Sequence, residues 1–157
     1  MAQRPPFDLT KVPTADKILA GGAFLLFIDS LLKWQTPCAT FQILGKICAG
    51  SANAWGGNAS FAGILMALFA LLLFIGEFMV IGGVVMPPTV SVPTVIAGLT
   101  AGTILFGIIK FLFVLANRPS YGAWIGLIII LSIAYGGYMK MQEARIVSPP
   151  GDSGFTP

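Results

Sequence analysis

Residues 61–86 read FAGILMALFALLLFIGEFMVIGGVVM, and this stretch decides the fold class. It holds 26 residues and a single charged side chain, Glu77. The hydrocarbon core of a bilayer is about 30 Å thick, so a helix needs roughly 20 apolar residues to cross it. A transmembrane strand would instead show about ten residues in strict alternation, which this run does not. The stretch therefore predicts a transmembrane helix.

Three further apolar runs complete a set of four. They cover residues 18–34 with one acid, 95–116 with one lysine, and 121–139 with no charge. Only the connection between the first two runs, residues 35–60, is long. We therefore expect an all-α integral membrane protein, a four-transmembrane-helix antiparallel bundle with one long external loop. The transmembrane domain is placed at 14–141, between an N-terminal tail at 1–13 and a C-terminal tail at 142–157.

Composition excludes several classes of protein. Hydrophobic residues make up 56% of the 157 positions and charged residues 10%, and the mean hydropathy is +0.88. In a soluble domain about a quarter of the residues are charged. This chain has too few charged residues to form the polar surface of a soluble globular domain. Histidine, the commonest general base and metal ligand, is absent from the sequence. We expect no enzyme, no nucleic-acid binding, no metal site and no cofactor.

The distribution of positive charge predicts the orientation. An even number of spans places both tails on one side, together with five positive residues, Arg4, Lys11, Lys17, Lys140 and Arg145. The opposite side has three, Lys33, Lys46 and Arg118. Lysine and arginine are enriched in cytoplasmic segments. Both termini are therefore expected in the cytoplasm, with the protein in the plasma membrane and the loop outside.

The two cysteines of the chain lie in that loop. Cys38 and Cys48 are ten positions apart, and an external loop would face an oxidising compartment. The favoured interpretation is a structural disulfide. A redox-active pair, as in quinone-linked thiol oxidases with four spans, is an alternative, although the sequence has neither a Cys-x-x-Cys motif nor a second pair. Free thiols are the remaining possibility.

Three ionisable residues fall within the spans, namely Asp29, Glu77 and Lys110. Each is costly in a bilayer, so each should face the bundle interior and have a partner. Counted at 1.5 Å per residue, Asp29 lies about 7–8 Å and Lys110 about 9 Å below the outer boundary. Their matching depth and opposite charge predict an Asp29–Lys110 ion pair.

Glu77 is expected near the bilayer midplane, nine residues from the end of its run, where no cation matches its depth. Its candidate partners are hydroxyl groups of the third and fourth spans: Thr100, Thr103, Ser132 and Tyr135. One interpretation is a neutral Glu77 that donates a hydrogen bond. The other is a proton or substrate site, as in small multidrug exporters, which have four spans and a membrane glutamate.

Glycine pairs predict close helix packing. Gly98 and Gly102 on the third span and Gly122 and Gly126 on the fourth both form GxxxG patterns, which allow two membrane helices to approach closely. The favoured interpretation is that these pairs bring spans three and four together. A dimer face is the alternative.

Four short motifs carry a family resemblance: LKW at 32–34, NAW at 53–55, YGAWIG at 121–126 and GGY at 136–138. They resemble motifs of uncharacterised small four-span membrane proteins of actinobacteria. The sequence departs from that pattern at Lys33, where those proteins usually have proline, and in its cysteine loop. The resemblance implies a membrane location and a four-span topology, and it supplies no activity.

The sequence therefore favours a non-catalytic membrane protein, either a structural or accessory subunit of a larger complex or a self-assembling bundle. Its expected partners are the lipid bilayer and other membrane subunits or further copies of itself, with no small-molecule substrate. The alternative function is a small proton-coupled transporter or channel that uses Glu77.

Overall fold

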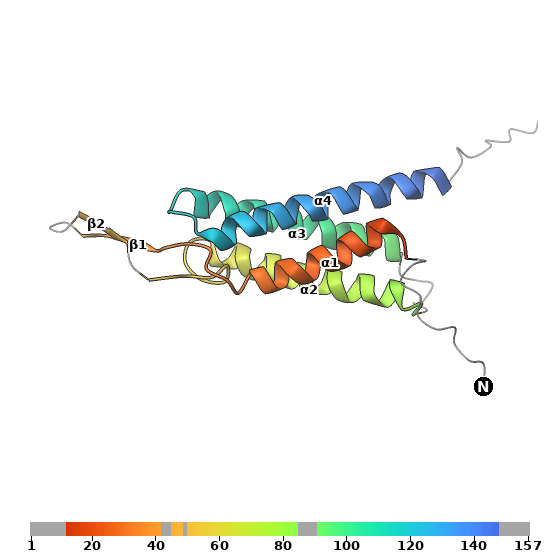
Figure 1. Cartoon of the computed structure of the whole chain (residues 1–157), viewed down its shortest axis with the longest axis horizontal. Helices are drawn as coiled ribbons and strands as arrows, with labels where there is room; N and C mark the ends of the chain where they lie inside the picture. Colours follow the sequence, from red (N-terminus) through yellow and green to blue (C-terminus); the bar gives the residue numbers. More distant parts are fainter. Residues whose placement is uncertain (1–11, 42–44, 49, 85–90, 148–157) are drawn as a thin grey trace, which may run out of the picture.

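The computed structural model describes residues 12–41, 45–48, 50–84 and 91–147, and within them the chain forms four helices and one β-hairpin (Figure 1). Their bounds are α1 Thr14–Asp29, β1 Cys38–Phe41, β2 Gly45–Cys48, α2 Ser60–Ile81, α3 Val92–Leu115 and α4 Tyr121–Val147. Three of the helices are long and apolar enough to cross a membrane, over Ser60–Ile81, Val92–Leu115 and Tyr121–Glu143. Helix α1 has 16 residues.

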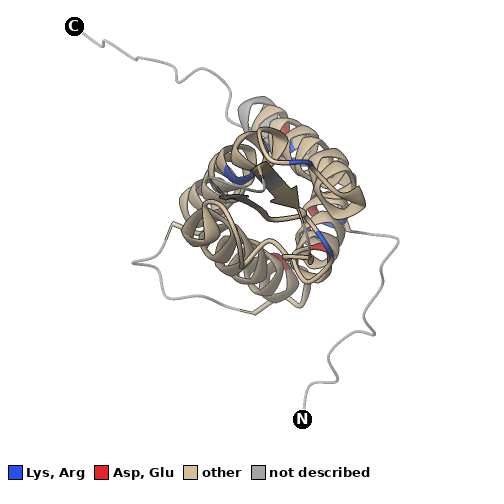
Figure 2. Ribbon diagram, turned by 90° about the vertical axis from the view of Figure 1, so that its left-hand side faces the viewer, with Lys and Arg blue, Asp and Glu red and all other residues tan. Residues whose placement is uncertain are grey.

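The helices run up and down and close into a ring (Figure 2). Each helix packs against its two neighbours in the order α1, α2, α3, α4, and α4 returns to α1. The core consists of apolar side chains in the middle of the ring, such as Leu19, Met66, Leu73, Ile130 and Ile133. Large apolar side chains also cover the outward faces of all four helices, including Phe24, Phe78, Leu112 and Ile128. This outer surface is one that hydrocarbon chains can solvate.

The bundle has two unlike ends. At the hairpin end, α1 and α3 finish, α2 and α4 begin, and the β-hairpin projects beyond the helices (Figure 1). At the other end, called here the terminal end, α1 and α3 begin and α2 and α4 finish.

Helix α2 is shorter than the apolar run predicts. It ends at Ile81 because Gly83 adopts a positive φ of 65°, and the Val84 N–H then bonds to the Met79 carbonyl. This is a Schellman C-cap, which glycine favours because it has no side chain to clash. The end of the predicted span, residues 85–86, lies outside the described residues. Glu77 is therefore four residues, or about 6 Å, from the end of its helix, rather than at its middle.

Helix α4 is longer than predicted. It continues to Val147, so residues 142–147, assigned to a C-terminal tail from the sequence, are helical. Lys140 therefore lies inside the helix, two turns before its end. Residues 148–157 of the predicted tail and residues 1–11 of the N-terminal one lie outside the described residues.

The loop between α1 and α2 contains a β-hairpin that the sequence did not predict. Strands β1 and β2 pair antiparallel with Cys38 opposite Cys48. The two cysteines form a disulfide, which confirms the predicted pairing. Past the hairpin, residues 52–58 fold back over the bundle, where Ala54 N–H bonds to the Ser30 carbonyl and Ala52 bonds to Trp34 and Gln35.

The GxxxG pairs do not bring α3 and α4 together. Gly122 and Gly126 make room for the Lys33 carbonyl and the Trp34 ring, Gly102 faces Phe69 of α2, and nothing lies within 4 Å of a Cβ built at Gly98. Contact between α3 and α4 is close instead at Gly107, where a Cβ would lie 2.6 Å from Ile130, and at Gly137, where it would lie 3.0 Å from Thr100. Three of the four GxxxG glycines therefore make room for the loop and for α2, while Gly98 has no neighbour to accommodate.

The packing of the loop against α2 can be tested with one pair of substitutions. A Cβ at Gly63 of α2 would overlap the Ala54 carbonyl, whereas the one at Gly98 of α3 meets nothing. We expect Gly63→Ala to lower the free energy of unfolding by about 1–3 kcal/mol, the usual cost of overpacking. Gly98→Ala should raise it by up to about 1 kcal/mol, because alanine favours helix over glycine. Thermal unfolding in detergent measures both, and equal effects would contradict this packing.

Candidate functional site

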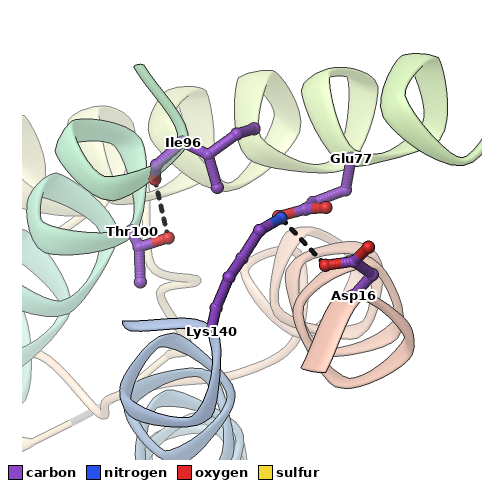
Figure 3. Close-up of polar contacts among 5 residues, drawn as sticks. All are labelled: Asp16, Glu77, Ile96, Thr100 and Lys140. Carbon is purple, nitrogen blue, oxygen red and sulfur yellow. Dashed lines mark hydrogen bonds and ion pairs between the residues drawn. The ribbon is translucent and has the colours of Figure 1, made fainter. Parts of the chain in front are cut away.

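A lysine and two acids from three helices meet inside the terminal end of the bundle (Figure 3). The Lys140 Nζ of α4 lies 2.6 Å from Glu77 Oε1 of α2 and 2.9 Å from Asp16 Oδ1 of α1. The Glu77 side chain is 0% exposed, that of Asp16 11% and that of Lys140 26%. We call these three residues the ion bridge.

The positions of the three residues in their helices explain why they meet. Asp16 is in the first turn of α1, Glu77 is one turn before the end of α2, and Lys140 follows the apolar part of α4. All three sites are at the terminal end because the helices alternate in direction. The flexible lysine stem allows the ammonium group to extend inward from α4 between the two acids (Figure 3).

The ion bridge neutralises an acid that would otherwise be buried alone. Charges removed from water are costly, and their mutual attraction offsets that cost only at short distance. Glu77 Oε1 accepts a hydrogen bond from Lys140, while Glu77 Oε2 has no hydrogen-bond partner among the described residues. Removing the lysine would therefore leave Glu77 buried with no counter-charge in contact.

The structure corrects the prediction that Glu77 lacks a cation. The proposed hydroxyl partners lie elsewhere: Thr100 and Thr103 are buried but donate to the carbonyls of Ile96 and Leu99 in their own helix. Ser132 is exposed and donates to the Ile128 carbonyl, and Tyr135 is 59% exposed on the outer surface. The error came from the assumed length of α2, which placed Glu77 too far from Lys140.

A second lysine, which is fully buried, binds the loop at the hairpin end. Lys110 of α3 is 0% exposed, and its Nζ donates to the carbonyl oxygens of Gly56 and Asn58 at 2.9 and 2.6 Å. The predicted Asp29–Lys110 ion pair is therefore wrong, since no salt bridge joins these two described residues. The partners are instead the backbone carbonyls of Gly56 and Asn58, which the sequence gave no reason to place inside the bundle.

Asp29 has a partner for only one of its carboxylate oxygens, because Oδ1 is buried with no hydrogen-bond partner among the described residues. The Trp34 indole Nε1 lies 3.1 Å from Asp29 Oδ2 and 3.0 Å from the Asp29 carbonyl oxygen, and the Trp34 side chain is fully buried. The ring fits over Gly126 of α4. Asp29, Trp34 and Gly126 thus fasten the end of α1 to α4.

A cavity of about 490 Å³ adjoins the ion bridge between α1, α3 and α4. Its polar part includes Asp16, Lys140 and Glu143, and its apolar wall is formed mainly by α3, with Ile96 and Ala101 among its residues. The contact between α3 and α4 is the least extensive of the four in the ring, which leaves this space open.

Sequence reasoning missed Asp16 and Lys140 as members of the site. A signal was present in Gly82 and Gly83, whose adjacent glycines favour a helix C-terminus there and would have moved Glu77 toward Lys140. No comparable signal exists for the carbonyl ligands of Lys110, because every residue carries a carbonyl group.

Comparisons with protein-family models, with curated proteins and with solved structures find no match to this chain. The resemblance to actinobacterial four-span proteins therefore stays a prediction. Among the described residues, no group of three His, Cys, Asp or Glu side chains is arranged to hold a metal ion. What the arrangement offers chemically is charge neutralisation inside an apolar bundle and an adjacent cavity.

The ion bridge predicts that removing Lys140 alone lowers the free energy of unfolding more than removing Lys140 and Glu77 together. Lys140→Met should lower the free energy of unfolding by about 3–5 kcal/mol, because Glu77 is left buried without its counter-charge. The double variant Lys140→Met, Glu77→Met should recover most of that loss. Unfolding in detergent measures both, with Lys17→Met on the exposed face of α1 as the matched control. A double variant no more stable than Lys140→Met alone would contradict the ion bridge.

Proposed function

We propose that the chain is a four-span plasma-membrane protein that acts as a non-catalytic structural or accessory subunit of a membrane complex, or as a self-assembling bundle. The observation that carries this proposal is the contrast between polar groups bonded inside the bundle and apolar side chains on its outer surface. Inside, Lys110, Lys140 and Asp29 are each bonded to groups of the same chain. Outside, the helices present large apolar side chains. Such a surface suits packing against lipid and other membrane helices.

The placement of α1 supports the fourth span. Its 16 residues measure about 24 Å, somewhat less than a hydrocarbon core. It nevertheless packs along α2 and α4, both of which are long enough to cross, so it shares their depth. The turn after it continues the apolar surface with the exposed side chains of Leu31 and Leu32. Together these features extend the apolar length of the first span beyond the helix itself.

Charge and the disulfide support the orientation. Lys17, Lys140 and Arg145 belong to the terminal end, and Arg4 and Lys11 precede α1 in the sequence, which favours that end for the cytoplasm. The disulfide at the hairpin end favours an oxidising compartment there. The salt bridge from Glu77 to Lys140 supports a structural role for this acid over proton-coupled transport, because the acid has a partner within its own chain.

The assembly role predicts that one outward face contacts protein. A photo-crosslinking amino acid would be placed in turn at Phe24, Phe78, Leu112 and Ile128, one exposed position on each helix. We expect one or two of these positions to give a protein adduct of defined mass, and the others to give lipid adducts only. The same substitution at the buried Leu73 is the control and should give no intermolecular adduct. The readout is native-gel sizing and mass spectrometry after gentle detergent extraction. A particle of one chain with no protein adduct at any position would overturn the proposal.

A further inference from the structure

The cavity between α1, α3 and α4 combines an apolar wall with a polar end. Its volume of about 490 Å³ is within the range of small-molecule sites, roughly 300–1,000 Å³. Pro93, Ile96, Ala97, Ala101 and Ile104 of α3 form most of the wall. Small side chains at Ala97 and Ala101 keep the space open. A flat or branched apolar group could lie along this wall.

The charges at the polar end are mainly negative. Asp16, Glu143 and Lys140 line the cavity, and Glu77 lies behind Lys140 in contact with its ammonium group. Lys140 is already engaged by two carboxylates, Asp16 and Glu77. Three acids and one lysine leave an excess of negative charge, which attracts a cation and repels an anion.

The hydrogen-bonding groups at this end are also mainly acceptors. The Thr100 hydroxyl, which lines the cavity, gives its proton to the Ile96 carbonyl and so presents an oxygen acceptor. The carboxylates of Asp16 and Glu143 are acceptors as well when ionised. A ligand with N–H donors would therefore find partners, whereas an anionic head group would meet acceptors.

We propose that this cavity binds a hydrophobic organic cation, with its apolar body along α3 and a protonated amine at Asp16 and Glu143. An acyl chain of the bilayer could fill the apolar part but would show no preference for charge. The proposed site is independent of the assembly role, and it departs from the sequence-based expectation that no small molecule binds.

A matched set of three probes tests the charge requirement. The purified full chain in lipid nanodiscs is titrated with 1-naphthylmethylammonium, 1-naphthylmethanol and 1-naphthylacetate, and binding is followed by calorimetry with empty nanodiscs as the blank. We expect the cation to bind at least tenfold more tightly than the alcohol, and the acetate to show no saturable binding. Equal binding of cation and alcohol, or saturable binding of the acetate, would overturn the proposal.

Two substitutions on α3 locate the site. Ala101→Phe fills the cavity and should weaken the cation's binding at least tenfold, whereas Leu105→Phe, one turn further on the outward face, should leave it unchanged. Glu143→Gln should weaken binding severalfold, since it removes one carboxylate from the polar end without touching the ion bridge. Thermal unfolding of each variant checks that the bundle is intact. Undiminished binding to a folded Ala101→Phe variant would place the site elsewhere and refute the proposal.

Discussion

Lys140 connects three of the four helices through one ammonium group. Because Glu77 is fully buried and no water reaches it, this acid needs a counter-charge from its own chain, and Lys140 reaches it from α4 while also binding Asp16 of α1. The bridge therefore fixes how α1, α2 and α4 meet at the terminal end. Helix α3 takes no part in it and is held by α2, where Gly76 faces Ile96 and Gly102 faces Phe69. The cavity lies beside α3 and α4, whose contact is the least extensive in the ring.

At the hairpin end, a buried charged side chain also has polar partners, but these are backbone groups. Lys110 comes from α3, the one helix absent from the ion bridge, and its partners are carbonyl oxygens of the loop between α1 and α2. Its ammonium group makes two hydrogen bonds, to backbone carbonyls that fold into the bundle and would be costly if left unpaired there. Each end of the bundle thus has one lysine bonded inside it, the half-buried Lys140 and the buried Lys110, and between them all four helices are engaged. This arrangement gives the buried Glu77 and Lys110 polar partners inside the bundle.

The sequence was sufficient for the helices and insufficient for their polar contacts. Apolar runs of 17–26 residues locate four helices, and two cysteines in one loop predict their disulfide. Polar partners depend on where helices end, and the run at 61–86 continues past the Gly83 C-cap without a change in hydropathy. An error of one turn moved Glu77 away from Lys140. The partners of Lys110 are main-chain atoms, which leave no trace in a pattern of side chains.

The most direct test of this account concerns the charge state of Glu77. Infrared spectra of the protein reconstituted in lipid would be compared between the native chain and Glu77→Gln, since a protonated carboxylic acid has a carbonyl band that a carboxylate lacks. A Glu77 paired with Lys140 is ionised, so the account predicts that the substitution removes carboxylate absorption and no protonated-acid band. Loss of a protonated-acid band on substitution would contradict the ion bridge as the interaction that holds the terminal end together.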